Sequence, residues 1–216
     1  MIVQAGMRVT HESSPTTFFG TIGGAATYKR QLILVTCFHC VYDTSFKSWT
    51  KPQLADHNNT VKIFNKANDA ETTGIIEKVL RDDRVDFALI KISAGNAIDS
   101  VIADWGNING IRSIEPGEQD VWVRMVGGVN KSFGKYEGIK PEFGAFYDDE
   151  ASPHFLTNLI KVRPVGQLSF SEKGDSGSLV LDLDNNIVGA VVMGDDQFSY
   201  IMPARILESR LEIKFK

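Results

Sequence analysis

Cysteine is scarce in this chain. Only two occur among 216 residues, and both stand in one tetrapeptide, at positions 37 and 40. Secreted chains of this size often carry several well-separated cysteines that form a disulfide framework. Because such a framework is missing, we expect a reducing compartment, the cytoplasm.

Long hydrophobic runs and an excess of basic residues are also missing. The longest apolar runs, at 32–35 and 187–193, fall well short of the roughly 18 residues that a membrane span needs. Residues 1–8 lack the basic start and apolar region of a signal peptide. The net charge of −4 argues against a nucleic-acid surface, which needs a basic face. We therefore expect neither a membrane nor a nucleic-acid partner.

Glycine and short β-rich runs, by contrast, are abundant. The chain has 19 glycines, and most of its apolar runs are short and bounded by Gly, Asn, Asp or Pro, the residues of turns. The Asp-Asn-Asn sequence at 184–186 predicts a tight hairpin, because asparagine tolerates positive φ. Strands are predicted over residues 3–9, 17–27, 31–36, 60–64, 74–80, 86–92, 120–126, 132–139, 156–162, 177–183, 187–193 and 198–202.

About a dozen short strands with no amphipathic helix between them predict an all-β sandwich or barrel. A weak break where Gly, Asn and Ser accumulate divides the chain into two β units, over 1–100 and 119–203, joined by a connection over 101–118. From Pro203 onward a partial helical stripe of apolar residues predicts a C-terminal helix over 204–216.

The segment Gly-Asp-Ser-Gly-Ser at 174–178 is the first candidate for chemistry. Glycine before Ser176 lets the backbone turn sharply, and glycine after it leaves room for a substrate carbonyl. Backbone N–H groups of Gly174 and Ser176 could then form an oxyanion hole. The alternative is a polar β-turn, because Gly, Asp and Ser are the commonest turn residues.

Two further segments carry the residue types that a nucleophilic serine needs. His39 lies at the end of the apolar run 31–36, where the ring can be held rigidly, although a lone histidine in such surroundings is more often a core residue. Asp86 enters a strongly apolar strand, which is costly for a carboxylate without a partner. Alternatively, Asp86 only ends the polar loop 81–84, and Asp83 is the fallback if Asp86 points outward.

The order His, Asp, Ser, with separations of 47 and 90 residues, resembles that of the trypsin-like serine peptidases of the chymotrypsin fold. Three motifs of the chain are similar to that family's: Thr-Cys-Phe-His-Cys at 36–40 to Thr-Ala-Ala-His-Cys, Asp-Phe-Ala-Leu at 86–89 to Asp-Ile-Ala-Leu, and the serine segment to Gly-Asp-Ser-Gly-Gly. The resemblance implies an all-β fold of two six-stranded antiparallel β-barrels with a C-terminal helix. It places His39 and Asp86 in the first barrel and Ser176 in the second.

The resemblance also implies a serine endopeptidase that acts through an acyl-enzyme. In that scheme Ser176 is the nucleophile, His39 the general base and Asp86 the group that orients the imidazole. No cofactor and no metal are expected. The expected partner is a protein or peptide substrate, and a regulatory protein is plausible. The resemblance also implies the substrate-binding residues Phe170, Lys173, Val192, Met193 and Gly194.

The chain departs from the family at two points. The family usually pairs the cysteine after the histidine with another about sixteen residues upstream, where this chain has Gly23 and Gly24, so we expect two buried free thiols. The family also activates itself with a new amino terminus that pairs with the aspartate before the serine. Asp175 is present, but its partner is not evident from the sequence.

Specificity is weakly indicated. Phe170 stands where trypsins place the aspartate of the pocket floor. This residue speaks against a preference for Arg or Lys and favours small or apolar side chains. Asp195 and Asp196 follow the expected pocket strand and could attract a basic residue, although a solvated turn is their simpler interpretation.

Three rival functions remain open at this level. Cys37 and Cys40 form a C-x-x-C motif after an apolar strand, as in thiol-disulfide oxidoreductases, but no βαβ pattern surrounds it. The same cysteines with His39 could bind zinc, although three ligands within four residues cannot easily face one ion. Finally, the double barrel could be a catalytically silent module that binds a partner.

Overall fold

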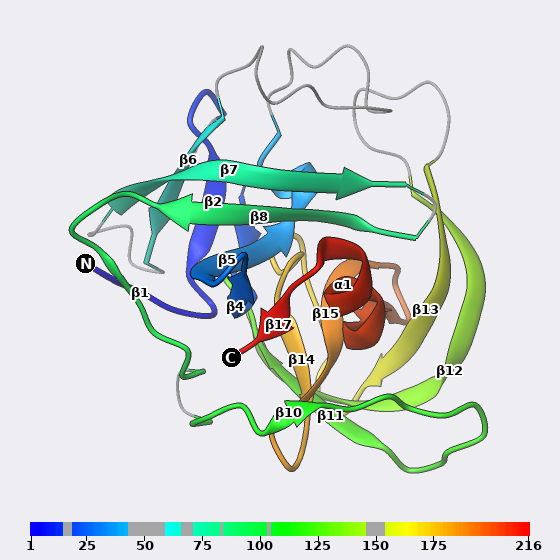
Figure 1. Ribbon diagram of the computed structural model, residues 1–216. Helices are drawn as coiled ribbons and strands as arrows, with labels where there is room; N and C mark the ends of the chain where they lie inside the picture. The colour runs from blue at the N-terminus through cyan, green and yellow to red at the C-terminus, as the bar shows by residue number, and fades with distance from the viewer. Residues whose placement is uncertain (15–18, 43–58, 66–70, 83, 103–104, 146–153) are drawn as a thin grey trace.

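The computed structural model folds mainly into two curved β-sheets (Figure 1). No helix in the described part of the chain is long and apolar enough to cross a membrane. The structure describes residues 1–14, 19–42, 59–65, 71–82, 84–102, 105–145 and 154–216.

The first sheet has eight strands, and every neighbouring pair in it is antiparallel. Only Ile22 and Gly23 separate β3 from β4, yet these two strands pair near opposite ends of the sheet, which therefore curls into a half-barrel. In spatial order its strands are β17 (Lys214–Phe215), β4 (Gly24–Tyr28), β5 (Gln31–Cys37), β8 (Asp86–Ile92), β7 (Glu71–Arg81), β6 (Thr60–Phe64), β2 (Arg8–His11) and β3 (Gly20–Thr21).

The second sheet closes on itself. Its strands β15 and β16 pair with each other as well as with their neighbours, which makes a closed six-stranded barrel, and the short strand β10 pairs with β15 outside this ring. In spatial order the strands are β10 (Gly110–Ile111), β15 (Asn186–Gly194), β14 (Leu179–Asp182), β11 (Trp122–Val126), β12 (Lys131–Ala145), β13 (His154–Pro164) and β16 (Ser199–Pro203). Outside both sheets, β1 (Ile2–Val3) pairs in parallel with β9 (Ala97–Ile98).

The predicted all-β architecture of two barrels is thus confirmed, with the first unit a curled half-barrel and the second a closed barrel. The predicted strands 60–64 and 86–92 match β6 and β8 residue for residue. The predicted hairpin lies between β14 and β15, and Asn185 there has the positive φ of 63°. Part of the predicted strand 17–27 lies outside the described residues.

The C-terminal helix is shorter than predicted. Helix α1 covers Ala204–Leu211, and the prediction of helix to residue 216 is wrong. Glu212 takes the left-handed conformation, with φ 61°, and its N–H bonds back to Glu208, which ends the helix. Residues 214–215 then pair with β4 of the first sheet, so both ends of α1 are fixed by strands.

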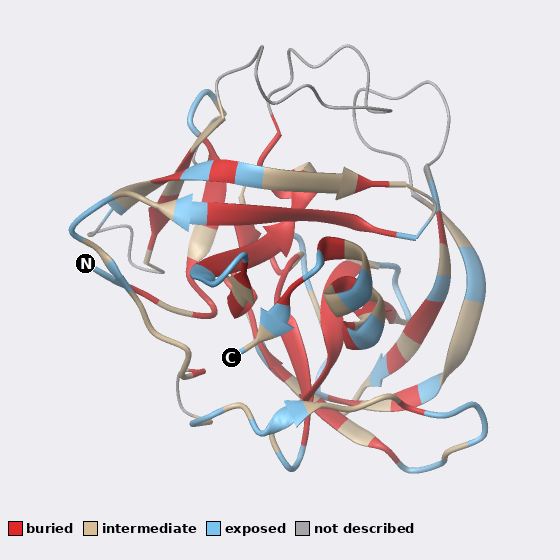
Figure 2. Cartoon of the chain, viewed as in Figure 1, coloured by how far each residue is buried: buried red, intermediate tan, exposed pale blue. Residues whose placement is uncertain are grey.

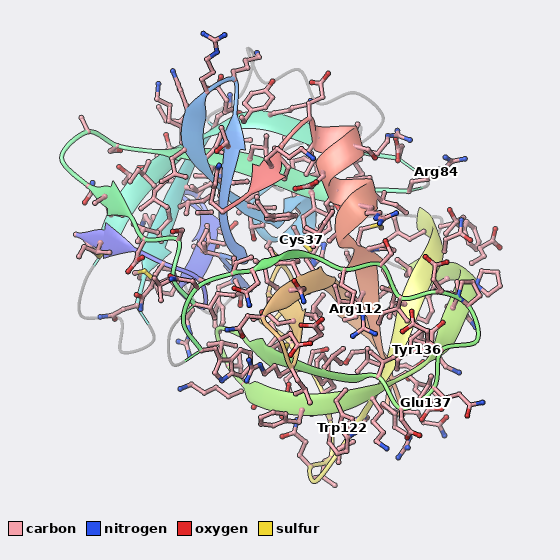
Figure 3. All side chains as sticks on the ribbon, turned by 60° about the horizontal axis from the view of Figure 1, so that its bottom comes forward. Cys37, Arg84, Arg112, Trp122, Tyr136 and Glu137 are labelled. Carbon is pink, nitrogen blue, oxygen red and sulfur yellow. The ribbon has the colours of Figure 1, made fainter. Side chains whose placement is uncertain are left out.

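The two sheets share one apolar core. A single cluster of buried side chains includes Val35 of β5 and Leu179 of β14, whereas a second cluster, with Val123 and Ile201, fills the closed barrel. Figure 2 shows the buried residues along the strands of both sheets. In Figure 3, Cys37 lies near the centre of the molecule, and its thiol donates to the carbonyl of Val191 at 3.2 Å. The end of β5 therefore lies against β15.

Candidate active site

His39 is presented by a tight turn at the end of β5. Residues Phe38–Cys40 form a single 3₁₀ turn, in which Phe38 and Cys40 are buried and anchor the segment. Successive residues of a 3₁₀ helix point about 120° apart. His39 is therefore directed away from the core, and 14% of its side-chain surface is exposed to solvent.

Asp86 begins β8, the strand that pairs with β5, so it emerges beside this turn. Its carboxylate is fully buried, and Oδ2 lies 2.6 Å from Nδ1 of His39. A carboxylate accepts a hydrogen bond from Nδ1–H, so in the neutral imidazole Nε2 carries the lone pair and faces away from Asp86. The structure thus brings two of the three predicted catalytic residues into direct contact.

The electrostatics of this pair favour the charged imidazole. Burial lowers the pKa of His39, but the neighbouring Cys40 and the Asp86 carboxylate raise it, to about 10. Burial also raises the pKa of the Cys37 thiol well above 9.0, which keeps that cysteine protonated.

Ser176 lies in the tight turn before β14, which packs against the end of β5. Gly174 and Gly177 have φ values of 103° and 96°, which an L-residue rarely adopts. The carbonyl of Ser176 accepts the N–H of Thr21 at 2.8 Å. A Cβ on Gly177 would lie 3.1 Å from the N of Cys37, so this turn packs against the end of β5, two residues before His39.

The hydroxyl of Ser176 is half-buried and donates to the carbonyl of Val192 at 3.4 Å. It is not hydrogen-bonded to His39 in this structure. The bond to Val192 is long, and catalytic hydrogen bonds of free enzymes often tighten only when substrate is bound. Rotation of the Ser176 side chain is the movement that would join it to the imidazole.

Asp175 finds its partners within the fold. Its carboxylate is fully buried, and Oδ1 accepts the backbone N–H groups of Val129 at 2.8 Å and Asn130 at 3.2 Å. Oδ2 accepts the N–H of Glu172 at 3.0 Å. A buried carboxylate with such donors is satisfied without a new amino terminus. Sequence reasoning missed these partners, because they are backbone N–H groups.

The predicted oxyanion donors are available. Within the described part of the chain, no hydrogen bond uses the N–H of Gly174 or Ser176. The hydroxyl of Thr21 donates to the carbonyl of Gly174 at 2.7 Å and accepts the N–H of Gly128 at 2.7 Å, which fixes the turn before the serine. Thr21 is a further residue of the site that sequence reasoning missed.

The predicted substrate-binding residues occupy different environments. The Phe170 ring belongs to the core of the closed barrel and is only 1% exposed, so the structure does not place it where a substrate could touch it. The Val192 side chain is also buried, and only its carbonyl faces Ser176. Met193 is half-buried, whereas Gly194 and Lys173 are exposed.

Asp195 is committed to its own turn. Oδ1 accepts the N–H groups of Gln197 and Phe198, and Oδ2 accepts the hydroxyl of Tyr200 at 2.6 Å. Although burial acts against it, these bonds hold the pKa of Asp195 below its usual value. Asp196 is exposed, and the fallback residue Asp83 lies outside the described residues.

Both cysteines are free and buried, as expected. The residue that faces Cys40 is Gly20 rather than Gly23 or Gly24: a Cβ on Gly20 would lie 2.2 Å from the Cys40 sulfur. Gly23 and Gly24 instead allow the close approach of Gly177 and Leu179. Among the described residues no group of three His, Cys, Asp or Glu side chains could hold a metal ion.

Neither a known protein family nor a curated protein matches the chain by sequence. Solved structures match over its whole length. The Nocardiopsis protease NAPase is 14% identical, with a TM-score of 0.69 and 100% of both chains covered. Thermobifida fusca protease A is 14% identical, with a TM-score of 0.66 and 99% of this chain and 98% of that one covered. The Cellulomonas bogoriensis chymotrypsin is 16% identical, with a TM-score of 0.66 and 100% and 99% covered. The chain therefore has the chymotrypsin-like serine protease fold.

Proposed function

We propose that this protein is a serine endopeptidase, with Ser176 as nucleophile, His39 as general base and Asp86 as the group that orients the imidazole. The observation that carries the proposal is the 2.6 Å contact between a fully buried Asp86 and His39, beside a serine turn that packs on the same strand end. A buried carboxylate held against a largely buried imidazole is costly to build, and it gives that imidazole the tautomer that a nucleophilic serine needs.

Catalysis would begin when Nε2 of His39 removes the proton of Ser176 as its oxygen attacks the substrate carbonyl. Asp86 stabilises the imidazolium that forms, and that imidazolium then protonates the leaving amine. The acyl group bound to Ser176 is released by water, which His39 activates in the same way. Each step moves one proton through the same ring nitrogen.

The oxyanion that forms on the substrate would be bound by the N–H groups of Gly174 and Ser176, which have no other acceptor in the described residues. One such donor contributes roughly 3 kcal/mol to transition-state stabilisation. Asp175 supports these donors, because its carboxylate ties the serine turn to the backbone of Val129 and Asn130. The proposed substrates are proteins or peptides.

A fluorophosphonate probe tests the proposal, because it phosphonylates only an activated serine. We expect labelling of the wild-type protein and loss of both labelling and peptide cleavage in Ser176→Ala. Ser209→Ala on helix α1 is the matched control, because among the described residues its exposed hydroxyl bonds only to the carbonyl of Ile206. Cleavage that persists in Ser176→Ala would contradict the proposal. A folded wild-type protein without labelling or cleavage would favour the silent binding module.

A further inference from the structure

Two serine hydroxyls lie next to the end of β15, close to the candidate active site. Gly194 is exposed and ends β15, two residues after the carbonyl that accepts the Ser176 hydroxyl. A Cβ on Gly194 would lie 3.5 Å from Oγ of Ser171 and 3.6 Å from Oγ of Ser199. Both hydroxyls therefore face the space that the missing side chain of Gly194 leaves open.

The protons of this pair can be assigned from its hydrogen bonds. The two Oγ atoms are 2.6 Å apart, and Oγ of Ser199 also accepts the backbone N–H of Ser171 at 3.1 Å. Neither hydroxyl has another partner in the described part of the chain. Ser199 is only 2% exposed, whereas Ser171 is half-buried.

Only one orientation leaves no buried donor unsatisfied. If Ser171 donated to Ser199, the proton of the buried Ser199 hydroxyl would have no acceptor, and an unsatisfied buried donor is costly. If Ser199 donates to Ser171, its own proton is satisfied, and the proton of Ser171 is left over. The pair therefore presents one free O–H donor, on the more accessible of the two serines, to the space beside Gly194.

The surroundings favour an uncharged acceptor for this donor. Neither hydroxyl bonds to a charged side chain in the described residues, and the adjacent Asp195 has its oxygens occupied by its own turn and by Tyr200. The lysines near this turn already have partners, because Lys140 acts on the charge of Asp195 and Lys161 lies 4.4 Å over the ring of Phe198. A carboxylate placed beside the pair would therefore gain one hydrogen bond but no countercharge of its own, and burying such a charge is costly. An amide oxygen gains the bond without that cost.

We propose that Ser171 is a specificity-determining residue that selects, on the acyl side of the cleaved bond, a side chain ending in an amide oxygen, glutamine or asparagine. The inference rests on the proposed function and deepens it. An acyl residue whose carbonyl oxygen lies at the N–H groups of Gly174 and Ser176 would extend its side chain along the end of β15, toward Gly194 and the hydroxyl pair.

A binding experiment on the Ser176→Ala background tests this inference without requiring cleavage. Four capped peptides differ only at the acyl-side residue, which is glutamine, glutamate, methionine or leucine. Calorimetry should show the glutamine peptide binding about 3- to 10-fold more tightly than the methionine peptide, which has a similar shape but no acceptor of equal strength. Adding Ser171→Ala should bring this ratio close to one.

Two further variants separate a direct contact from a general disturbance. Ser169→Ala removes a nearby hydroxyl whose only partner in the part of the chain that the structure describes is Glu172, and it should leave the ratio unchanged. Ser199→Ala removes the buried partner but leaves the donor of Ser171, so the glutamine preference should persist. If Ser199→Ala abolishes the preference as completely as Ser171→Ala does, the hydroxyl pair acts only through structure and the inference is wrong.

The remaining outcomes also decide the question. A ratio that Ser171→Ala does not change, tightest binding of the glutamate peptide, or no binding of any peptide would each overturn the inference. Loss of this inference alone would leave Ser176-dependent cleavage intact in the wild-type protein. Failure of the proposed function would instead show as the absence of cleavage and labelling, whatever the peptides bind.

Discussion

Replacing Gly127 by alanine should disable the protein, although the residue touches no substrate. The new Cβ would lie 2.0 Å from Oδ1 and 2.6 Å from Cγ of Asp175. Gly127 is not among the residues with positive φ, so alanine adds no backbone strain and the effect comes from this contact alone. Because both groups are buried, the carboxylate has to move by more than an ångström to restore ordinary contact.

The size of the effect follows from what that movement breaks. Asp175 accepts three backbone N–H groups at 2.8, 3.0 and 3.2 Å, and hydrogen bonds to a charged group contribute about 1.5–3 kcal/mol each. Loss of two of them predicts a decrease of about 3–6 kcal/mol in the free energy of unfolding. The serine turn loses its anchor at the same time, so labelling of Ser176 should fall even in the fraction that stays folded.

Urea unfolding measures the first quantity and fluorophosphonate labelling the second. A double-mutant cycle supplies the control, because the clashing carboxylate is absent in an Asp175→Ala background. In that background Gly127→Ala should lower the free energy of unfolding only slightly, since the one close contact left is the 3.0 Å approach of its Cβ to Oγ of Ser178. If Gly127→Ala lowers the free energy of unfolding by less than about 1 kcal/mol, or if the two substitutions are additive, the proposed role of this contact is refuted.

Other perturbations test the same site. Asp86→Asn should lower cleavage by about 10⁴-fold, because the imidazole loses its orienting carboxylate; an effect below tenfold in kcat/KM would contradict this. In Ser176→Ala protein, NMR titration should place the pKa of His39 above 6.5, and Asp86→Asn should lower this pKa. Since only the neutral imidazole accepts a proton, kcat/KM of the wild-type protein should rise as the pH passes through the pKa of His39. Gly20→Ala should lower the free energy of unfolding by about 1–3 kcal/mol, because its Cβ would lie 2.2 Å from the buried Cys40 sulfur; a urea unfolding curve that does not change would count against this close approach.

The sequence was sufficient to predict those elements whose ends are set locally. Strand β8 begins at a charged residue after a polar loop, and β6 ends where its apolar alternation ends, so both were predicted correctly. The strand predicted over 132–139 is longer in the structure: β12 continues past Pro141 to residue 145. Beyond Lys135 it pairs with β13 alone, and a strand with one unpaired edge tolerates proline.

What sequence reasoning missed depends on contacts between distant segments. Strand β17 forms only because β4 offers an edge to it, and nothing in residues 214–215 by themselves predicts a strand. Phe170 was assigned to substrate binding by its spacing from the serine, yet its ring turned inward to fill the closed barrel. The partners of Asp175 are backbone N–H groups, which every residue carries, so no pattern of side chains could reveal them.

The pairing of β17 with β4 has a consequence for how the chain folds as it is made. Every other strand of the first sheet precedes residue 93, but the outer edge of β4 is covered only when residues 214–216 arrive to bond with Ala25, Ala26 and Thr27. Throughout translation of the closed barrel this edge remains open, and an open edge invites pairing with another nascent chain. The protein therefore becomes safe from such aggregation only after residues 214–216 have left the ribosome and paired with β4.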